Sequence, residues 1–182
     1  AHLGLYGGST TSYATDARTQ LISGWHPDIG LSVGYRGEGV AELMASFSLG
    51  LGAAYDTNSP EKHAAFDLLI EPTVLIHWYE AWPISAYAGL GGLFASFDVS
   101  QDGAIQRALG PNAVLGFLWR SDEHSALFID THGGLAYNPD ARKLAETEST
   151  EVLGQAPESR EYDEGQWLPI LRVTIGYRLT AF

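Results

Sequence analysis

The chain has 182 residues, no cysteine and a formal net charge of −12, from 22 acidic and 10 basic side chains. The lack of cysteine excludes disulfides, thiolate metal sites and cysteine nucleophiles. The acidic balance argues against nucleic-acid binding, which needs clustered lysine and arginine. We expect one domain, residues 1–182, because a chain of this length closes a single barrel or core.

Apolar residues occur at every second position through most of the chain. A strict period of two, rich in β-branched and aromatic residues, is typical of strands whose two faces meet different surroundings. The expected strands are His2–Thr10, Ile29–Tyr35, Ala41–Tyr55, Phe66–Tyr79, Ile84–Val99, Ala113–Trp119, Leu127–Tyr137 and Trp167–Leu179.

The connections between these strands alternate in length. The polar segments 11–27, 56–63, 100–110 and 138–165 are long, whereas 36–39, 80–83 and 120–124 are short turns. Such alternation is typical of a meander that has all its tight turns at one end. We therefore predict an all-β fold, an eight-stranded antiparallel up-and-down transmembrane β-barrel whose short turns face the periplasm.

Aromatic residues at the ends of the apolar stripes indicate that the apolar face points outward to lipid. Indole and phenol rings combine an apolar body with a polar tip, so they favour the two water–lipid interfaces. The expected interface residues are Tyr35, Trp78, Trp82, Trp119 and Tyr177 beside the short turns, and Tyr55, Tyr137 and Trp167 beside the long loops.

The opposite face of the strands carries charges among glycine, serine and alanine. Small residues suit the interior of an eight-stranded barrel, which only just accommodates its own side chains. The expected lumen charge network is Glu42, Asp67, Glu71, His77, Asp130, His132, Arg172 and Arg178. Because buried charges must be paired, we expect Asp130 to pair with Arg172 on the neighbouring last strand.

Further charges on the same face lie nearer the short turns. We expect a second layer of the lumen here, formed by Arg36, Glu42, His77, Arg120 and Arg178. The period of two also assigns Tyr79 to this inward face, opposite to Trp78.

The closing segment Ile175-Gly-Tyr-Arg-Leu179 resembles the last strand of small bacterial outer-membrane barrels of the OmpX and OmpA transmembrane-domain type. The segment Glu80 to Gly92, EAWPISAYAGLGG, is similar to the turn and glycine-rich strand in the middle of those proteins. The resemblance implies location in the bacterial outer membrane, folding by the barrel-assembly machinery, and contact with outer-membrane lipids and lipopolysaccharide. It implies no particular activity, because this fold supports adhesins, enzymes, channels and structural proteins.

No catalytic site is expected. His132, oriented by Asp130, would need a hydroxyl nucleophile, but the nearby Thr131 and Ser125 belong to the lipid-facing set of positions. Segment 131–139 distantly resembles the histidine-containing segment of outer-membrane lipid A deacylases. Gly134 stands where that family has a serine, so the activity is not carried over.

No cofactor or metal site is expected either. The six histidines are scattered and show no spacing typical of metal ligands. The acidic segment 138–165 leaves open whether divalent cations bind there, although such runs are more often solvated.

Three hypotheses for function follow. The first is a non-enzymatic outer-membrane barrel with a charged, closed lumen, whose long loops serve surface interaction or structural packing. The second is a narrow channel for ions or small solutes, which requires the lumen charges to line water instead of pairing. The third is a lipid-modifying outer-membrane enzyme.

Overall fold

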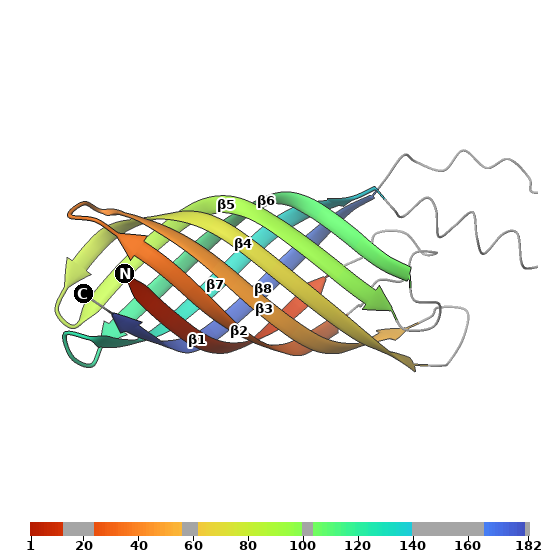
Figure 1. The fold of residues 1–182 in the computed structure, drawn as a ribbon, viewed down its shortest axis with the longest axis horizontal. Helices are drawn as coiled ribbons and strands as arrows, with labels where there is room; N and C mark the ends of the chain where they lie inside the picture. Colours follow the sequence, from red (N-terminus) through yellow and green to blue (C-terminus); the bar gives the residue numbers. More distant parts are fainter. Residues whose placement is uncertain (13–23, 56–61, 100–103, 140–165, 181–182) are drawn as a thin grey trace, which may run out of the picture.

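The computed structural model describes residues 1–12, 24–55, 62–99, 104–139 and 166–180. They form eight antiparallel strands that close into a barrel (Figure 1). The strands are β1 (His2–Ser12), β2 (Gly24–Arg36), β3 (Ala41–Tyr55), β4 (Lys62–Ala81), β5 (Ile84–Val99), β6 (Ala104–Arg120), β7 (Ser125–Asn138) and β8 (Gln166–Thr180). Each strand pairs with the next one in sequence, and β8 closes the barrel against β1. The predicted eight-stranded up-and-down barrel is confirmed.

The two ends of the barrel differ. The turns at residues 37–40, 82–83 and 121–124 lie together with both chain ends at one end, which we call the short-turn end (Figure 1). At the opposite end, the long-loop end, the strands lead into segments 13–23, 56–61, 100–103 and 140–165, which lie outside the described residues. Most of the acidic segment 138–165 therefore lies outside the described residues.

The strands are longer at the long-loop end than the sequence predicted. β2 begins at Gly24 and β6 at Ala104, inside the predicted loops 11–27 and 100–110, so those boundaries were wrong. A strand needs only about 9–11 residues to cross a bilayer, whereas β6 has 17. Beyond the hydrocarbon the outward positions no longer need to be apolar, as the exposed Arg107 illustrates. The strand pairing therefore continues past the bilayer into segments where the outward residues are no longer regularly apolar. The alternating sequence pattern does not predict a strand in such segments.

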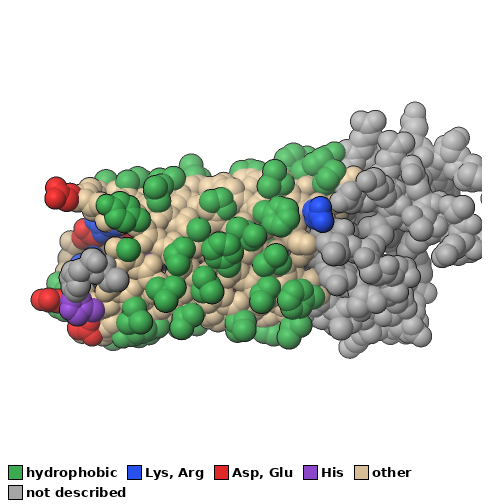
Figure 2. Space-filling model, in the orientation of Figure 1, with side chains coloured by type: hydrophobic (Ala, Val, Ile, Leu, Met, Phe, Trp, Pro, Cys, Tyr) green, Lys and Arg blue, Asp and Glu red, His purple; other side chains and the backbone are tan. Residues whose placement is uncertain are grey.

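Burial alternates along the strands as predicted. On β7, Leu127 and Ile129 are exposed while Phe128 and Asp130 between them are buried. Figure 2 shows hydrophobic side chains spread over the visible wall of the barrel, with the acidic and histidine side chains at the short-turn end. An apolar outer surface of this extent matches the hydrocarbon of a bilayer. Among the described residues no helix is long or apolar enough to cross a membrane.

Tyr79 departs from the predicted alternation. The pairing of β4 with β5 shifts register between His77 and Tyr79, which is a β-bulge. Trp78 and Tyr79 are therefore both exposed, at 61% and 48%. The prediction that Tyr79 faces inward was wrong, because a bulge adds one residue to a strand and reverses the parity after it.

The turn at residues 121–124 is held by side-chain hydrogen bonds. The Ser125 hydroxyl donates to Asp122 at 2.5 Å, and the backbone N–H of His124 donates to the same carboxylate at 2.8 Å. These bonds lower the pKa of Asp122, the Ser125 hydroxyl having the larger effect. The Thr180 N–H donates to the His124 carbonyl at 2.7 Å, which joins the turn to the end of β8.

Because the outer face of the barrel contacts lipid, we predict that a charged side chain placed on it destabilises the protein. Phe47 lies in the middle of β3 and is 38% exposed on the outer wall. We expect Phe47→Arg to lower the free energy of unfolding in lipid vesicles by about 2–4 kcal/mol, because arginine in the hydrocarbon loses its hydration. Urea unfolding measures this change, with Glu38→Arg in the turn as the control. Equal costs for the two variants would contradict an outward lipid-facing surface.

Candidate functional site

The barrel interior, or lumen, contains the predicted charge network. All eight predicted side chains lie inward and are 1–4% exposed, namely Glu42, Asp67, Glu71, His77, Asp130, His132, Arg172 and Arg178. Asp28 and His2 are buried inside as well, at 4% and 9%. Among the described interior residues the carboxylates outnumber the arginines, so polar neighbours other than arginine must also solvate them.

Arg172 is the centre of the middle layer. Its guanidinium donates to the Glu71 carboxylate and, at 2.6 Å, to the Ser48 hydroxyl. Asn112 donates to the other oxygen of Glu71 at 3.0 Å. The Arg172 Cζ atom also lies 5.5 Å from the centroid of the Tyr6 ring. We call Ser48, Glu71, Asn112, His132 and Arg172 the Arg172 cluster.

His132 lies directly opposite Arg172 in the register of β7 with β8. The Arg172 Nη2 atom is 3.2 Å from its Nδ1. The same Nδ1 lies 3.3 Å from the Glu71 carboxylate. Nε2 lies 3.8 Å from an oxygen of Asp130. The imidazole thus connects the Arg172 cluster with the next carboxylate toward the short-turn end.

Asp130 pairs with a tyrosine and not with Arg172. The Tyr87 hydroxyl donates to Asp130, and the register places Thr174 opposite Asp130. Gly116 makes room for this pair, because a Cβ there would lie 2.1 Å from Oδ1 of Asp130. The predicted Asp130–Arg172 pair was wrong. The stagger of the strands decides which inward residues share a level, and periodicity does not reveal it.

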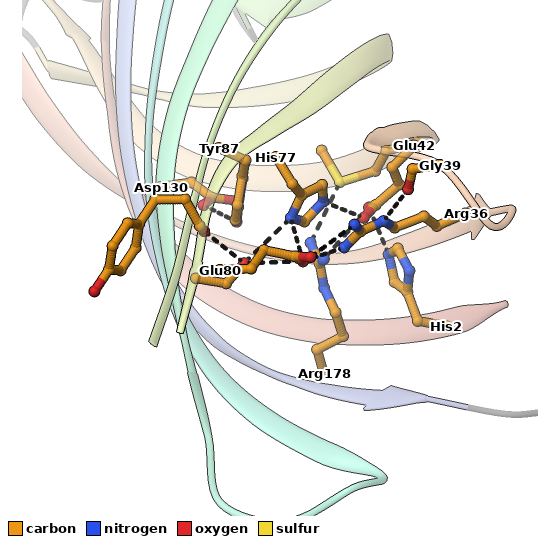
Figure 3. Close-up of polar contacts among 12 residues, drawn as sticks. His2, Arg36, Gly39, Glu42, His77, Glu80, Tyr87, Asp130 and Arg178 are labelled. Carbon is orange, nitrogen blue, oxygen red and sulfur yellow. Dashed lines mark hydrogen bonds and ion pairs between the residues drawn. The ribbon is translucent and has the colours of Figure 1, made fainter. Parts of the chain in front are cut away.

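A second polar group lies nearer the short-turn end (Figure 3). Glu42 accepts hydrogen bonds from Nε2 of His77 at 2.8 Å and from Arg178 at 3.3 Å. Nε2 of His2 is 3.4 Å from the same carboxylate. The Arg178 guanidinium also lies 5.7 Å from the ring centroid of Tyr87. We call His2, Glu42, His77 and Arg178 the Glu42 cluster.

Arg36 and Arg120, which we predicted in this layer, bind Glu80 at the rim instead. Arg36 donates to Glu80 through both terminal nitrogens, and Arg120 donates at 3.2 Å. The Glu80 carboxylate therefore links the hairpins β2–β3, β4–β5 and β6–β7. Figure 3 shows its contact with Arg36. These three side chains are 24–36% exposed, so each pair contributes only about 0–1 kcal/mol.

The rest of the lumen is more apolar than predicted. The long-loop apolar cluster lies on the long-loop side of Arg172 and contains Leu69, Leu93, Ala95, Ala108, Ala136, Leu168 and Ile170. A second apolar cluster contains Tyr6, Met44, Leu75, Tyr87, Val114, Leu118, Ala126 and Phe128. We expected glycine, serine and alanine to dominate the uncharged inward positions. The leucines and aromatics found there fill the barrel from within.

Sequence reasoning missed several residues of the interior and one, Glu80, at the rim. The missed polar contacts are made by His2, Tyr6, Asp28, Ser48, Glu80, Tyr87 and Asn112. Most of these residues occupy the inward-facing alternate positions of their strands. The predicted network included only charged side chains at such positions, and including aromatic and uncharged polar side chains would have found them. Asp28 was missed because the predicted strand began only after it, at Ile29, whereas β2 begins at Gly24.

The predicted interface aromatics lie on the outer wall where their side chains are described. Exposed fractions are 64% for Tyr35, 61% for Trp78, 63% for Trp82, 62% for Trp119, 54% for Trp167 and 42% for Tyr177. The Tyr137 ring lies beside Trp167, with centroids 5.4 Å apart. The side chain of Tyr55 is outside the described residues.

Neither of the two hydroxyls considered as nucleophiles is placed to act with His132. Thr131 is exposed on the outer wall while His132 is 4% exposed inside, so the strand separates the hydroxyl from the imidazole. Ser125 is engaged with Asp122 in the turn. Within the described part of the chain no group of three or more histidine or acidic side chains is arranged to hold a metal ion.

A closed eight-stranded barrel with an apolar exterior and a filled, ion-paired interior has the architecture of small outer-membrane β-barrel proteins. The solved structure of Neisserial surface protein A is similar, with a TM-score of 0.62 and 12% identity over 99% of this chain and 96% of that one. The outer membrane protein OprG from Pseudomonas aeruginosa gives 0.58 and 12%, over 98% and 94%. Ail, the attachment invasion locus protein of Yersinia pestis, gives 0.50 and 10%, over 97% of both chains.

These likenesses confirm the fold predicted from the closing strand and the meander. No family model and no curated protein matches the sequence. The three solved structures are at most 12% identical to this chain, so the likeness concerns the fold.

We predict that replacing an arginine of the interior lowers the free energy of unfolding much more than replacing an arginine at the rim. We expect Arg172→Met to lower the free energy of unfolding by about 3–5 kcal/mol, because Glu71 is left buried without its cation. Adding Glu71→Gln to that variant removes the unpaired charge and recovers part of the loss. Urea unfolding from vesicles measures both. Arg120→Met at the rim is the control, with an expected cost within about 1 kcal/mol. Equal costs for the two arginines would contradict this assignment.

Proposed function

We propose that the protein is a non-enzymatic outer-membrane barrel whose lumen is closed to ions and sizeable solutes. Its segments at the long-loop end serve surface interaction or structural packing. Outer-membrane lipids and lipopolysaccharide surround it, and the barrel-assembly machinery folds it. No nucleic acid and no cofactor takes part.

The filling of the lumen supports this proposal. The Arg172 cluster links side chains from β3, β4, β6, β7 and β8 across the interior. The long-loop apolar cluster covers it with side chains that are 0–5% exposed. An ion would have to break the Glu71–Arg172 pair and shed its water among leucines. Both steps are costly in a low-dielectric interior.

The names of two similar structures agree with a role at the cell surface. One is called a surface protein and another an attachment invasion locus protein.

Planar-bilayer recording tests the closed lumen. We expect no steady unitary currents from the folded protein. A triple variant, Leu69→Ala with Leu93→Ala and Leu168→Ala, should admit current because it removes the bulk of the long-loop apolar cluster. The control replaces three outward leucines, Leu49→Ala with Leu90→Ala and Leu109→Ala. Steady currents from the unmodified protein that change in Glu71→Gln or Arg172→Ala would establish the narrow channel instead.

Incubation with lipopolysaccharide tests the absence of enzyme activity. We expect the mass spectrum of lipid A to be unchanged, because Thr131 and His132 lie on opposite sides of the barrel wall. Loss or transfer of an acyl chain that depends on His132 would overturn the proposal. Heat-modifiable gel mobility confirms that the tested sample is folded.

A further inference from the structure

Both ring nitrogens of the buried His132 face a carboxylate. Nδ1 lies 3.3 Å from an oxygen of Glu71 on β4, and Nε2 lies 3.8 Å from an oxygen of Asp130 on β7 itself. A neutral imidazole has one N–H and one lone pair, so either tautomer turns a lone pair toward one of these carboxylates. An imidazolium has an N–H on each nitrogen and faces both carboxylates favourably. The surroundings of His132 therefore suit its protonated form.

The neutral ring also has partners. Arg172 lies opposite His132 in the register of β7 with β8, and its Nη2 atom is 3.2 Å from Nδ1. A guanidinium only donates, so neutral His132 accepts at Nδ1 and directs the N–H of Nε2 toward Asp130. When a proton binds at Nδ1, Arg172 and His132 both direct N–H groups at the same oxygen of Glu71. His132 can therefore gain or lose a proton while the strands stay in place.

The charges in contact with His132 favour the proton. Glu71 and Asp130 carry two negative charges, Arg172 carries one positive charge, and these three side chains are only 1–3% exposed. A proton on His132 makes the four side chains neutral as a group. Because unbalanced charge is costly in a low-dielectric interior, the folded barrel gains from this proton.

The side chains that surround this group on the other strands are uncharged. Ser48 on β3 and Asn112 on β6 are neutral members of the Arg172 cluster. Tyr6 on β1 and Tyr87 on β5 each donate a hydrogen bond through the hydroxyl, so both phenols keep their protons. These four neighbours therefore add no charge of either sign.

The remaining charged side chains of the described lumen do not replace the proton. The ladder row of Asp130 continues across β8 and β1 to Asp28, and across β3 to Asp67. Both are buried carboxylates, so their charge has the same sign as the excess beside His132. Arg178 donates to Glu42 in the Glu42 cluster. The local excess of negative charge around His132 therefore persists.

Polar side chains connect His132 with the short-turn end. The Tyr87 hydroxyl donates to Asp130, and Tyr87 pairs with His77 in the register of β4 with β5. Nδ1 of His77 lies 3.7 Å from Glu80, whose side chain is 36% exposed at the rim. The long-loop apolar cluster on the other side contains only leucine, isoleucine and alanine. We therefore expect protons to reach His132 from the short-turn end.

We propose that His132 is a reversible proton-binding site, and that proton uptake there strengthens the link across the lumen between β7 and β4. The bound proton places a second cation beside Glu71, on a strand that is not a neighbour of β7 in the sheet. The proton comes from solvent at the short-turn end and returns to it as the pH rises. The proposal goes beyond a closed lumen, because it makes the strength of the closure depend on pH.

Urea unfolding at about pH 5.5 and about pH 8 tests the effect on stability. The folded protein holds a proton that the unfolded chain releases first, so this stabilisation is complete at low pH and is lost as folded His132 releases its proton at higher pH. For one proton, the equilibrium constant of unfolding rises by up to about tenfold per pH unit. We therefore expect the unmodified protein to be more stable than His132→Gln at the lower pH, with a smaller difference at the higher pH.

The matched control is His77→Gln. The ring of His77 also lies between two carboxylates, those of Glu42 and Glu80, but the arginines Arg36, Arg120 and Arg178 bind them. His77→Gln should keep the pH dependence of the unmodified protein. A difference between the unmodified protein and His132→Gln that does not change with pH would overturn the proposal. A pH dependence that disappears only in His77→Gln would also overturn it.

NMR spectra of the folded protein with isotope-labelled histidine rings provide a second test. Both ring nitrogens of His132 should carry hydrogen at low pH and only one at high pH, the signals being assigned by their absence in His132→Gln. Asp130→Asn keeps an acceptor for Tyr87 but removes a negative charge, so proton release should move to lower pH by about one unit or more. Glu38→Gln in the exposed turn should leave it unchanged.

Two NMR results would contradict the site. One is a His132 ring whose signals do not change over the pH range in the unmodified protein, which needs no variant to fold. The other is proton release that Asp130→Asn does not move. Glu71→Gln, which removes the carboxylate beside Nδ1, provides the same comparison if Asp130→Asn does not fold.

Discussion

The structure depends on one constraint, the pairing of every backbone polar group inside hydrocarbon. Water is absent there, and an unpaired N–H or carbonyl costs several kcal/mol. Strands meet this condition only when the sheet has no edge, and the pairing of β8 with β1 removes it. Closure on eight strands then sets the diameter, and the diameter sets how much side chain the lumen must hold.

The lumen and the outer wall respond to this constraint in different ways. Inside, the carboxylates are held by arginine, histidine, tyrosine and asparagine, and leucines occupy the remaining space. Outside, large apolar residues cover much of the ladder.

Much of the candidate site was predictable, though not its contacts. The period of two assigned Glu71, Asp130 and Arg172 to the same face, since parity is a local property of an extended chain. It did not reveal that Arg172 binds Glu71 on β4, because the two residues come together only through the stagger of a closed sheet. Tyr79 shows another limit, since a bulge reverses parity without any mark in the apolar pattern.

The sequence by itself determined the number of strands, their order, the face of each that points outward and the aromatic residues of the outer wall. Local alternation and loop length are sufficient for these, because each strand needs one apolar face in hydrocarbon. Only the tertiary structure decided which charges pair and how far the strands extend beyond the bilayer. Those features arise from residues on several strands at once, and their alignment is set when the barrel closes.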